Sequence, residues 1–338
     1  MHLSNVLFKK LAVSQRIDDK EYVKVTQMGH IIEMISIARK PDTLQNYVKL
    51  SKEAYAVVDR HTGEVTEIKE YAINENRSQN ISGLKKTLKN IKDLINSNFS
   101  GAPNELFITL TYALIDGLPM NDVKKASRDF DVFIKRFRRK HPDLQYIAVL
   151  EPQASSSWHW HLLVKFIDWQ NHNQVYINNN ETIEPMWGHG WTRTQRIDNV
   201  DNVGAYLGAY LGDIEITDNN KDEVFSSVYK NSCDICVEEK EVTDNDGKRV
   251  IKRFVKGGRM HLYPSGTNIV RYSKGIKKPE PRMMRYSEAR KIVGDREPDF
   301  SRTIEISENK DGTLGRRYNT ITYESYNLKR KKNENGGV

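Results

Sequence analysis

Two histidines separated by one tryptophan, His159-Trp160-His161, form the most distinctive chemical feature of the sequence. They lie in an apolar run that predicts a β-strand over residues 158–166, and side chains alternate between the two faces of a strand. His159 and His161 therefore share one face, about 7 Å apart, and the tryptophan points to the core. Two imidazoles in this arrangement can bind one divalent metal ion. The alternative is a pair of surface histidines that bind no metal.

A third metal ligand has to come from a neighbouring strand. Residues 146–151 predict a buried strand, and the polar turn that follows predicts an antiparallel hairpin with the histidine strand. Glu151 is the first candidate ligand, because a carboxylate oxygen suits Mg²⁺ or Mn²⁺, and Gln153 is the second. Three protein ligands leave coordination positions open for a phosphate oxygen, as a Lewis-acid catalyst requires.

Two tyrosines four residues apart, Tyr206 and Tyr210, follow in a predicted helix at residues 200–211. This spacing places both phenols on one helix face. A phenol is a poor nucleophile at neutral pH, but a metal ion that polarises a phosphodiester allows its oxygen to attack. The alternative is a pair of tyrosines at the edge of the core. Gly204 in the same helix indicates either close packing against another element or local mobility.

The elements that would position these groups follow from hydrophobic periodicity and turn residues. A helix at 82–94 precedes strand, helix, strand, strand, strand and helix at residues 106–112, 121–141, 146–151, 158–166, 190–197 and 200–211. Asp198 or Asn199 is expected to cap the last helix. In the first strand, Thr109 and Thr111 share a face. This order predicts an α+β fold, a mainly antiparallel sheet with helices packed on one face.

The composition is that of a globular protein. The 338 residues suggest two domains, with 38% hydrophobic and 29% charged residues. No apolar run is long enough for a membrane span, and the N-terminus lacks the pattern of a signal peptide. Cys233 and Cys236 are the two cysteines, which excludes a disulfide scaffold and leaves zinc binding or redox chemistry as a weak alternative. We therefore expect a cytoplasmic protein without a membrane partner.

Positive charge is concentrated in part of the chain. Residues 248–291 contain 14 Lys and Arg but only two acidic residues, whereas residues 211–247 contain 11 acidic residues and three basic ones. The whole chain has a formal net charge of +8. This pattern favours a nucleic-acid partner, although two solvated faces of opposite charge would look the same. The candidate DNA contacts are Arg136, Arg138, Arg139, Lys165, Arg193, Arg196, Arg271, Lys274, Lys277 and Lys278.

Together, the strand at 106–112, the His159-Trp160-His161 segment and the Tyr206-x-x-x-Tyr210 helix occur in a fixed order. In this order and spacing the chain resembles the HUH endonuclease superfamily, and within it the rolling-circle replication initiators of plasmids, phages and integrative elements. The resemblance extends over about residues 80–280. It includes the segment from Arg271 to Pro279, which resembles the close of the same replication-protein domain.

The resemblance implies a ferredoxin-like sheet that binds Mg²⁺ or Mn²⁺ through His159, His161 and, less securely, Glu151. Tyr206 and Tyr210 would be the nucleophiles that cleave single-stranded origin DNA, leaving a 5′-phosphotyrosine and a free 3′-OH. The expected organisation is an N-terminal extension at 1–80, a nuclease domain at 81–212, an acidic insert at 213–247, and a basic C-terminal region at 248–338 that completes the domain and ends in a polar tail. Partners would be single-stranded or supercoiled origin DNA, and a host helicase and polymerase, since no Walker-type nucleotide-binding sequence is present.

The chain departs from these initiators at two positions. Related sequences often carry lysines three residues after each tyrosine, where this chain has Ala209 and Asp213. Lys165, Arg193 or Arg196 would then have to replace them. Two other functions stay open, a conjugative relaxase or transposase of the same superfamily, and a non-catalytic DNA-binding regulator of replication.

Overall fold

The computed structural model describes most of the chain. The described residues are 7–13, 17–38, 45–51, 54–59, 62–70, 81–153, 157–169, 175–198, 200–212, 214–216, 237–243, 249–255, 262–264, 266–310 and 313–330. Asn199, Asp213, Cys233 and Cys236 lie outside them. Within the described residues, no helix is long and apolar enough to cross a membrane.

The chain forms two compact units. Residues 27–31 and 75–279 make up the central unit, and residues 1–26, 32–74 and 280–338 make up the terminal unit. The central unit contains the histidine strand and the tyrosine helix.

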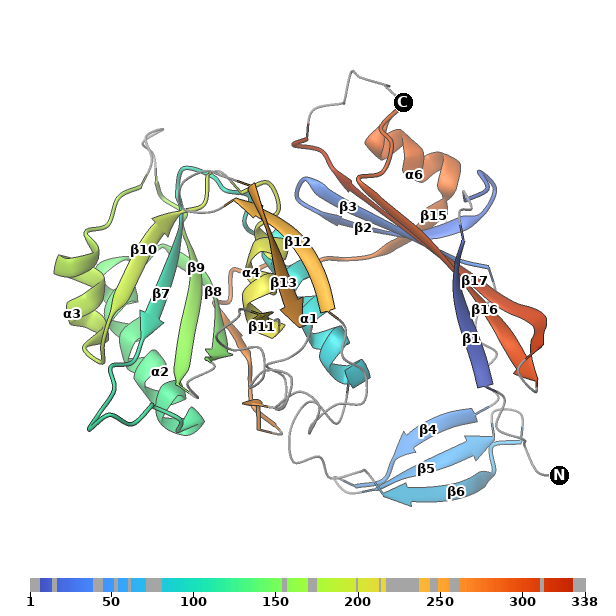
Figure 1. Cartoon of the computed structure of the whole chain (residues 1–338), viewed down its shortest axis with the longest axis horizontal. Coiled ribbons are helices and arrows are strands. Elements are labelled where there is room, and N and C mark those ends of the chain that lie inside the picture. The colour runs from blue at the N-terminus through green and yellow to red at the C-terminus, as the bar shows by residue number, and fades with distance from the viewer. Residues whose placement is uncertain are drawn as a thin grey trace. The chain divides into compact units, whose positions relative to one another are not determined.

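A five-stranded antiparallel sheet forms the core of the central unit (Figure 1). Its strand order is β10-β7-β9-β8-β14, with bounds Thr192–Arg196, Glu105–Thr111, Trp158–Phe166, Leu144–Pro152 and Val270–Tyr272. Strands β8 and β9 are buried along almost their whole length, as expected for a sheet that is covered on both faces. The strand that carries the two histidines is thus the middle strand of the sheet.

Helix α2 (Val123–Lys140) forms because its apolar residues follow a helical period. Phe130, Phe133 and Phe137 are fully buried against the sheet. The Asp122 side chain caps the helix, accepting hydrogen bonds from the backbone N–H groups of Lys124 and Lys125 at 2.8 and 3.0 Å. The basic residues of its last turn suit the negative end of the helix dipole.

Helices lie on both faces of the central sheet (Figure 1). On one face, the Trp160 indole donates a hydrogen bond to the Ala126 carbonyl of α2 at 3.1 Å. On the other face, Phe107 of β7 contacts Tyr206 of α4 (Val203–Gly212), which packs against α1 (Ile81–Asn96). The predicted α+β class with mainly antiparallel strands is confirmed, but the expectation that helices cover only one face of the sheet is wrong. The periodicity of each helix gives the width of its apolar face and not the side of the sheet it covers.

Smaller elements complete the central unit. A π-helical turn, η2 (Asn179–Ile183), continues into α3 (Glu184–Trp187). Strands β11 (Ile214–Ile216), β12 (Val237–Thr243) and β13 (Arg249–Val255) form a separate antiparallel sheet in the order β11-β13-β12.

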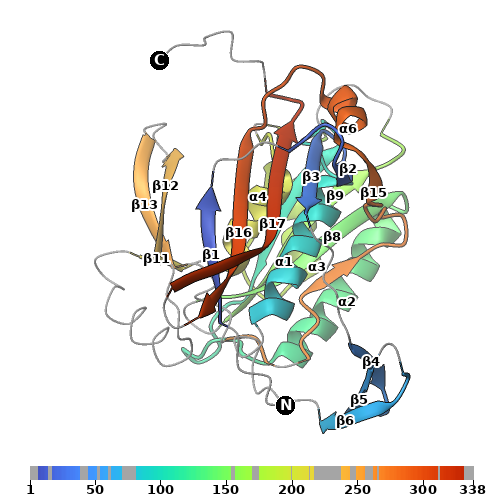
Figure 2. The same cartoon turned by 90° about the vertical axis from the view of Figure 1, so that its right-hand side faces the viewer.

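The terminal unit joins the two ends of the chain in one sheet (Figure 2). The order is β1-β16-β17-β3-β2-β15, with bounds Leu7–Val13, Phe300–Lys310, Thr313–Asn327, Ile31–Ile37, Tyr22–Met28 and Arg282–Arg285. Val23, Ile32 and Tyr326 pack with α6 (Tyr286–Val293) in a second core. Strands β4 (Gln45–Lys49), β5 (Ala54–Asp59) and β6 (Val65–Glu70) form a small antiparallel sheet of their own.

Candidate nuclease site

The strand register defines one face of the central sheet, here called the histidine face. His159 lies directly between Thr111 of β7 and Glu151 of β8, and His161 lies between Thr109 and Val149. The predicted hairpin between β8 and β9 is confirmed by this register. Because side chains opposite each other in an antiparallel pair share a face, both histidines, both threonines and the carboxylate are on the histidine face.

The opposite face fixes the strand. Trp160 is fully buried, and its ring stacks on Phe130 of α2 with a centroid distance of 4.3 Å. A shift of β9 by one residue would expose this tryptophan and bury the histidines against α2. The packing of Trp160 therefore determines which way the two imidazoles point.

The side chains of His161 and Glu151 are in contact, His161 Nε2 with Glu151 Oε2. On its other ring nitrogen, Nδ1, His161 lies 3.3 Å from Thr109 Oγ1. If Nδ1 carries the proton and donates it to the threonine, the Nε2 lone pair points at the carboxylate. Such an arrangement favours a cation between the two groups, and Thr109 then orients the ring, as outer partners of metal-bound histidines do.

Burial keeps the two imidazoles neutral. His159 and His161 are 7% and 5% exposed, and Glu151 is 4% exposed. Desolvation by burial lowers the pKa of both histidines from 6.5 to about 4, and for His159 the neighbouring His161 lowers the pKa further. At pH 7 both rings are therefore uncharged and have a lone pair available for a metal ion. The contact between His161 and Glu151 is then not an ion pair at this pH.

Three buried polar atoms at one end of the histidine face have no hydrogen-bond partner, namely His159 Nε2, Thr111 Oγ1 and Ser157 Oγ. Thr111 and His159 are opposite each other in the register, and Ser157 is two residues before His159. Buried polar groups are normally paired, so these atoms indicate a place for a polar or charged ligand. Thr109 and Thr111 were expected on a common face, but nothing in the sequence indicated that one orients a histidine and the other lacks a partner.

The donor atoms suit a divalent cation, whereas their present spacing does not yet form a complete site. The ring centroids of His159 and His161 are 6.3 Å apart. In the part of the chain that the structure describes, no three His, Cys, Asp or Glu side chains are spaced to hold one ion. His161 and Glu151 already converge, so a rotation of the His159 side chain would be needed to add the third ligand.

Tyr206 is on the histidine face, one aromatic ring away from His161. Phe107 stacks on the His161 ring with a centroid distance of 5.5 Å and an interplanar angle of 4°. The Tyr206 ring meets Phe107 edge-on, with centroids 6.1 Å apart. Tyr210 is in the same helix, and its side chain lies outside the described part of the structure.

The tyrosine helix is held by a close contact with α1. The Gly204 N–H donates a 2.7 Å hydrogen bond to Asn96 Oδ1, and a Cβ at this glycine would be 2.6 Å from both Asn96 Oδ1 and the Lys92 carbonyl. Close packing, rather than mobility, therefore explains Gly204. The helix begins at Val203 and is capped by Asn202, whose Oδ1 accepts from Ala205 N–H at 2.9 Å. The expected start at residue 200, with a cap at Asp198 or Asn199, is wrong because Asn202 provides the side-chain acceptor.

Comparison with known protein families bears on this segment. A family of replication-associated proteins, described under the name ORF2, matches residues 105–215, from the first residue of β7 into β11. The matched stretch contains both histidines, Glu151 and both tyrosines. Residues 105–215 are of the replication-associated type. Neither a curated protein nor a solved structure matches the chain.

Two predicted DNA contacts are on the histidine face of the replication-associated segment. Arg193 of β10 is paired in register with Thr109 and is exposed. Lys165 of β9 is on the same face, but its ammonium forms a 2.8 Å ion pair with the buried Glu105 and contacts the Asn98 carbonyl. The charge of Lys165 is thus compensated within the protein, and that of Arg193 is more accessible to a phosphate.

The other predicted DNA contacts are elsewhere. Arg271 is on the α2 face, where it pairs with Asp131, and Arg196 is on that face too because its register partner is Leu106. Arg136, Arg138 and Arg139 belong to α2, and Lys274, Lys277 and Lys278 are exposed after β14. The basic residues predicted from sequence therefore surround the sheet on several sides, and their contacts with DNA stay predictions.

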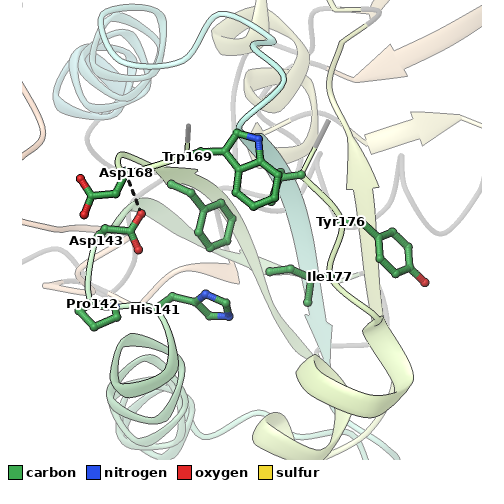
Figure 3. Close-up of a pocket in the computed structure, with 9 residues that line it drawn as sticks. His141, Pro142, Asp143, Asp168, Trp169, Tyr176 and Ile177 are labelled. Carbon is green, nitrogen blue, oxygen red and sulfur yellow. Dashed lines mark hydrogen bonds between the residues drawn. The ribbon is translucent and has the colours of Figure 1, made fainter. Parts of the chain in front are cut away.

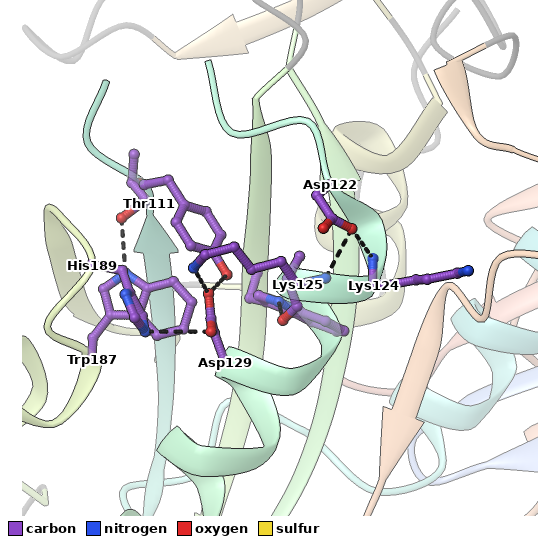
Figure 4. Close-up of polar contacts among 10 residues, drawn as sticks. Thr111, Asp122, Lys124, Lys125, Asp129, Trp187 and His189 are labelled. Atoms are coloured by element: carbon purple, nitrogen blue, oxygen red, sulfur yellow. Dashed lines mark hydrogen bonds and ion pairs between the residues drawn. The ribbon is translucent and has the colours of Figure 1, made fainter. Parts of the chain in front are cut away.

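A second polar cluster joins α2 to the end of β7 (Figure 4). Asp129 accepts hydrogen bonds from the Tyr112 hydroxyl at 2.9 Å and from Lys125 Nζ at 2.5 Å, and His189 Nε2 is 3.7 Å from its other oxygen. Burial of Asp129 would raise its pKa, but the hydrogen bonds from Lys125 and Tyr112 and the charges of His189 and Lys125 outweigh this and lower it. Trp187, 1% exposed, packs on Tyr112 with centroids 4.9 Å apart. The Lys125–Asp129 spacing was a possible indication in the sequence, but the tyrosine partner was not.

A cavity of about 340 Å³ opens at the far end of α2 (Figure 3). Its lining includes His141, Phe166, Trp169 and Tyr176. Phe166 is the last residue of β9, so the cavity is at the opposite end of this strand from His159. It is therefore not part of the site around the two histidines.

Proposed function

We propose that the chain is a replication initiator that nicks single-stranded origin DNA by transferring a phosphodiester to a tyrosine. The single observation that carries this proposal is the common face of the sheet. His161 and Tyr206 flank the ring of Phe107 there, within the segment of the replication-associated type. A nucleophile and a pair of neutral imidazoles that share one face can act on the same phosphate.

The reaction would be a transesterification. The phenolic oxygen of Tyr206 or Tyr210 attacks phosphorus, a new P–O bond forms to the tyrosine, and the bond from phosphorus to the 3′ oxygen breaks. The phenol releases its proton to solvent, and the departing 3′ oxygen takes up a proton to become a 3′-OH. The 5′ end of the DNA stays attached to the protein. The 3′-OH can then prime DNA synthesis, or attack the phosphotyrosine and restore the original strand.

His161, Glu151 and, after rotation, His159 would hold Mg²⁺ or Mn²⁺. When bound, the ion would neutralise the scissile phosphate and polarise it as a Lewis acid. Thr109 fixes the His161 ring, and Trp160 fixes the strand that carries both histidines. Phe107 excludes water between His161 and Tyr206, which strengthens electrostatic interactions at the phosphate.

A nicking assay tests this function. Supercoiled DNA of the replicon that encodes the chain should be converted to an open circle with Mn²⁺ or Mg²⁺ but not with EDTA. The double variant Tyr206→Phe/Tyr210→Phe should abolish conversion. Tyr176→Phe is the matched control, because this tyrosine is 75% exposed and lines the distant cavity.

A non-catalytic regulator of replication would give a different result. It would bind the same DNA equally well with EDTA, and the histidines and tyrosines would be dispensable. Nicking by the double variant at the wild-type rate would overturn the tyrosine mechanism.

A further inference from the structure

Strand β10 is an edge strand of the central sheet, and its outward residues continue the histidine face (Figure 1). The Thr111 N–H donates a 2.8 Å hydrogen bond to the Trp191 carbonyl, which extends the register of β10 with β7 by one residue. Trp191, Arg193 and Gln195 therefore lie on the same face as the two histidines. The alternate residue Thr192 is buried on the other face, where its hydroxyl is bonded to Asn179.

Trp191 and Arg193 are each aligned with one histidine. The row across the sheet that starts at Trp191 continues through Thr111 and His159, and the row that starts at Arg193 continues through Thr109 and His161. Neighbouring strands are about 4.8 Å apart, so each β10 residue is about 10 Å from its histidine. The row of Trp191 contains two of the unpaired polar atoms, Thr111 Oγ1 and His159 Nε2.

Both side chains are open to solvent. Trp191 is 57% exposed, the most exposed tryptophan among the described residues, whereas Trp158, Trp160 and Trp187 are buried. Arg193 is also exposed, and within the described chain no ion pair engages its guanidinium. A large aromatic ring and an uncompensated cation two residues apart on one strand are the combination that binds single-stranded nucleic acid. The ring stacks on a base, and the cation binds the backbone.

We propose that Trp191 and Arg193 form a binding strip for single-stranded DNA beside the nuclease site. Trp191 stacks on the unpaired base that flanks the reacting phosphate, and Arg193 binds a neighbouring backbone phosphate. This inference rests on the proposed function for the position of the reacting phosphate. Duplex DNA is excluded as the occupant of the strip, because its bases are already stacked on one another and cannot offer a face to the indole.

The test separates base stacking from backbone contact. Affinities are measured in EDTA by fluorescence anisotropy for a labelled oligothymidine and for an abasic deoxyribose-phosphate chain of the same length. Trp191→Ala should weaken oligothymidine binding by about 5- to 150-fold and leave binding of the abasic chain unchanged. Arg193→Ala should weaken both, and should reduce the slope of log affinity against log salt by about 0.7.

Matched variants control for folding and for general charge. Trp191→Phe keeps an aromatic ring and should recover most of the affinity lost in Trp191→Ala. Trp169→Ala removes a partly exposed tryptophan from the distant cavity and should bind oligothymidine as the wild type does. An equal loss for the two DNA ligands in Trp191→Ala, or no loss, would overturn the stacking role.

Failure of this inference and failure of the proposed function give different results. If the wild type forms a covalent adduct with metal but Trp191→Ala binds normally, the binding strip is wrong and the nuclease stands. If no adduct forms but oligothymidine binding depends on Trp191, the nuclease is wrong and the strip stands as a DNA site. Once the nick is mapped, an abasic residue moved along the strand should remove the effect of Trp191→Ala only next to the nick.

Discussion

Replacing Gly204 by alanine should loosen the helix that carries the tyrosines. The new Cβ would be 2.6 Å from Asn96 Oδ1 and from the Lys92 carbonyl, whereas ordinary contact begins at 3.4 Å. The helices α1 and α4 would therefore have to separate by about 0.8 Å, the difference between the two distances, since the Lys92 oxygen belongs to the backbone and cannot rotate away. The 2.7 Å hydrogen bond from Gly204 N–H to Asn96 would be weakened at the same time.

The magnitude follows from opposing terms. Overpacking costs about 1–3 kcal/mol and the lost hydrogen bond about 1 kcal/mol, whereas alanine is about 1 kcal/mol better than glycine within a helix. The net expectation is a loss of about 1–3 kcal/mol in the free energy of unfolding. Because a misplacement of about 1 Å can reduce a catalytic rate about 100-fold, adduct formation by Gly204→Ala should also slow strongly.

Urea unfolding, with adduct formation measured on the same preparations, checks this expectation. Ala205→Gly is the control, because Ala205 is exposed on the same helix and its replacement should cost only the helix propensity, about 1 kcal/mol. If Gly204→Ala were more stable than the wild type and equally active, the tight approach of α4 to α1 would be refuted.

Three further predictions concern the network around the site. The pKa of His159 and His161 is lowered from 6.5 to about 4, so the unfolded chain binds more protons between these values, and stability of the metal-free protein should fall by about 2 kcal/mol per imidazole from pH 7 to pH 5. Urea midpoints at the two pH values measure this, and a His159→Gln/His161→Gln variant with the same pH dependence would contradict it. Thr109→Val removes the group that orients His161 and should lower Mn²⁺ affinity by about 10- to 100-fold in a calorimetric titration, and an unchanged affinity would show that Thr109 does not position the ring. Tyr112→Phe leaves Asp129 with its Lys125 contact and should cost about 1 kcal/mol in thermal unfolding without changing Mn²⁺ affinity, and a loss of Mn²⁺ binding would place the Asp129 cluster within the metal site.

Local patterns in the sequence were sufficient where one interaction dominates. The apolar spacing of α2, the alternation in β9 and the polar turn between β8 and β9 predicted these elements to within two residues and aligned Glu151 with His159. The Trp160 side chain explains this success, because a large residue that has only one buried position fixes the register without help from distant parts of the chain.

Contacts between distant segments could not be derived in the same way. The start of α4 depends on Asn202, and the need for Gly204 depends on Asn96, more than 100 residues earlier in the chain. The pairing of β1 with β16 likewise joins segments from opposite ends of the chain. Such long-range pairings are determined by the complementarity of two surfaces, and periodicity describes only one surface at a time.

The most direct test of the account is to identify the residue that becomes covalently attached to DNA. The protein is incubated with Mn²⁺ and a single-stranded oligonucleotide from its own replication origin, then digested with protease and nuclease, and the modified peptide is sequenced by mass spectrometry. We expect a nucleotide joined through its 5′ phosphate to Tyr206 or Tyr210, and no such peptide when EDTA is present. Efficient cleavage without any tyrosine adduct, or attachment to a tyrosine outside α4, would contradict the central claim.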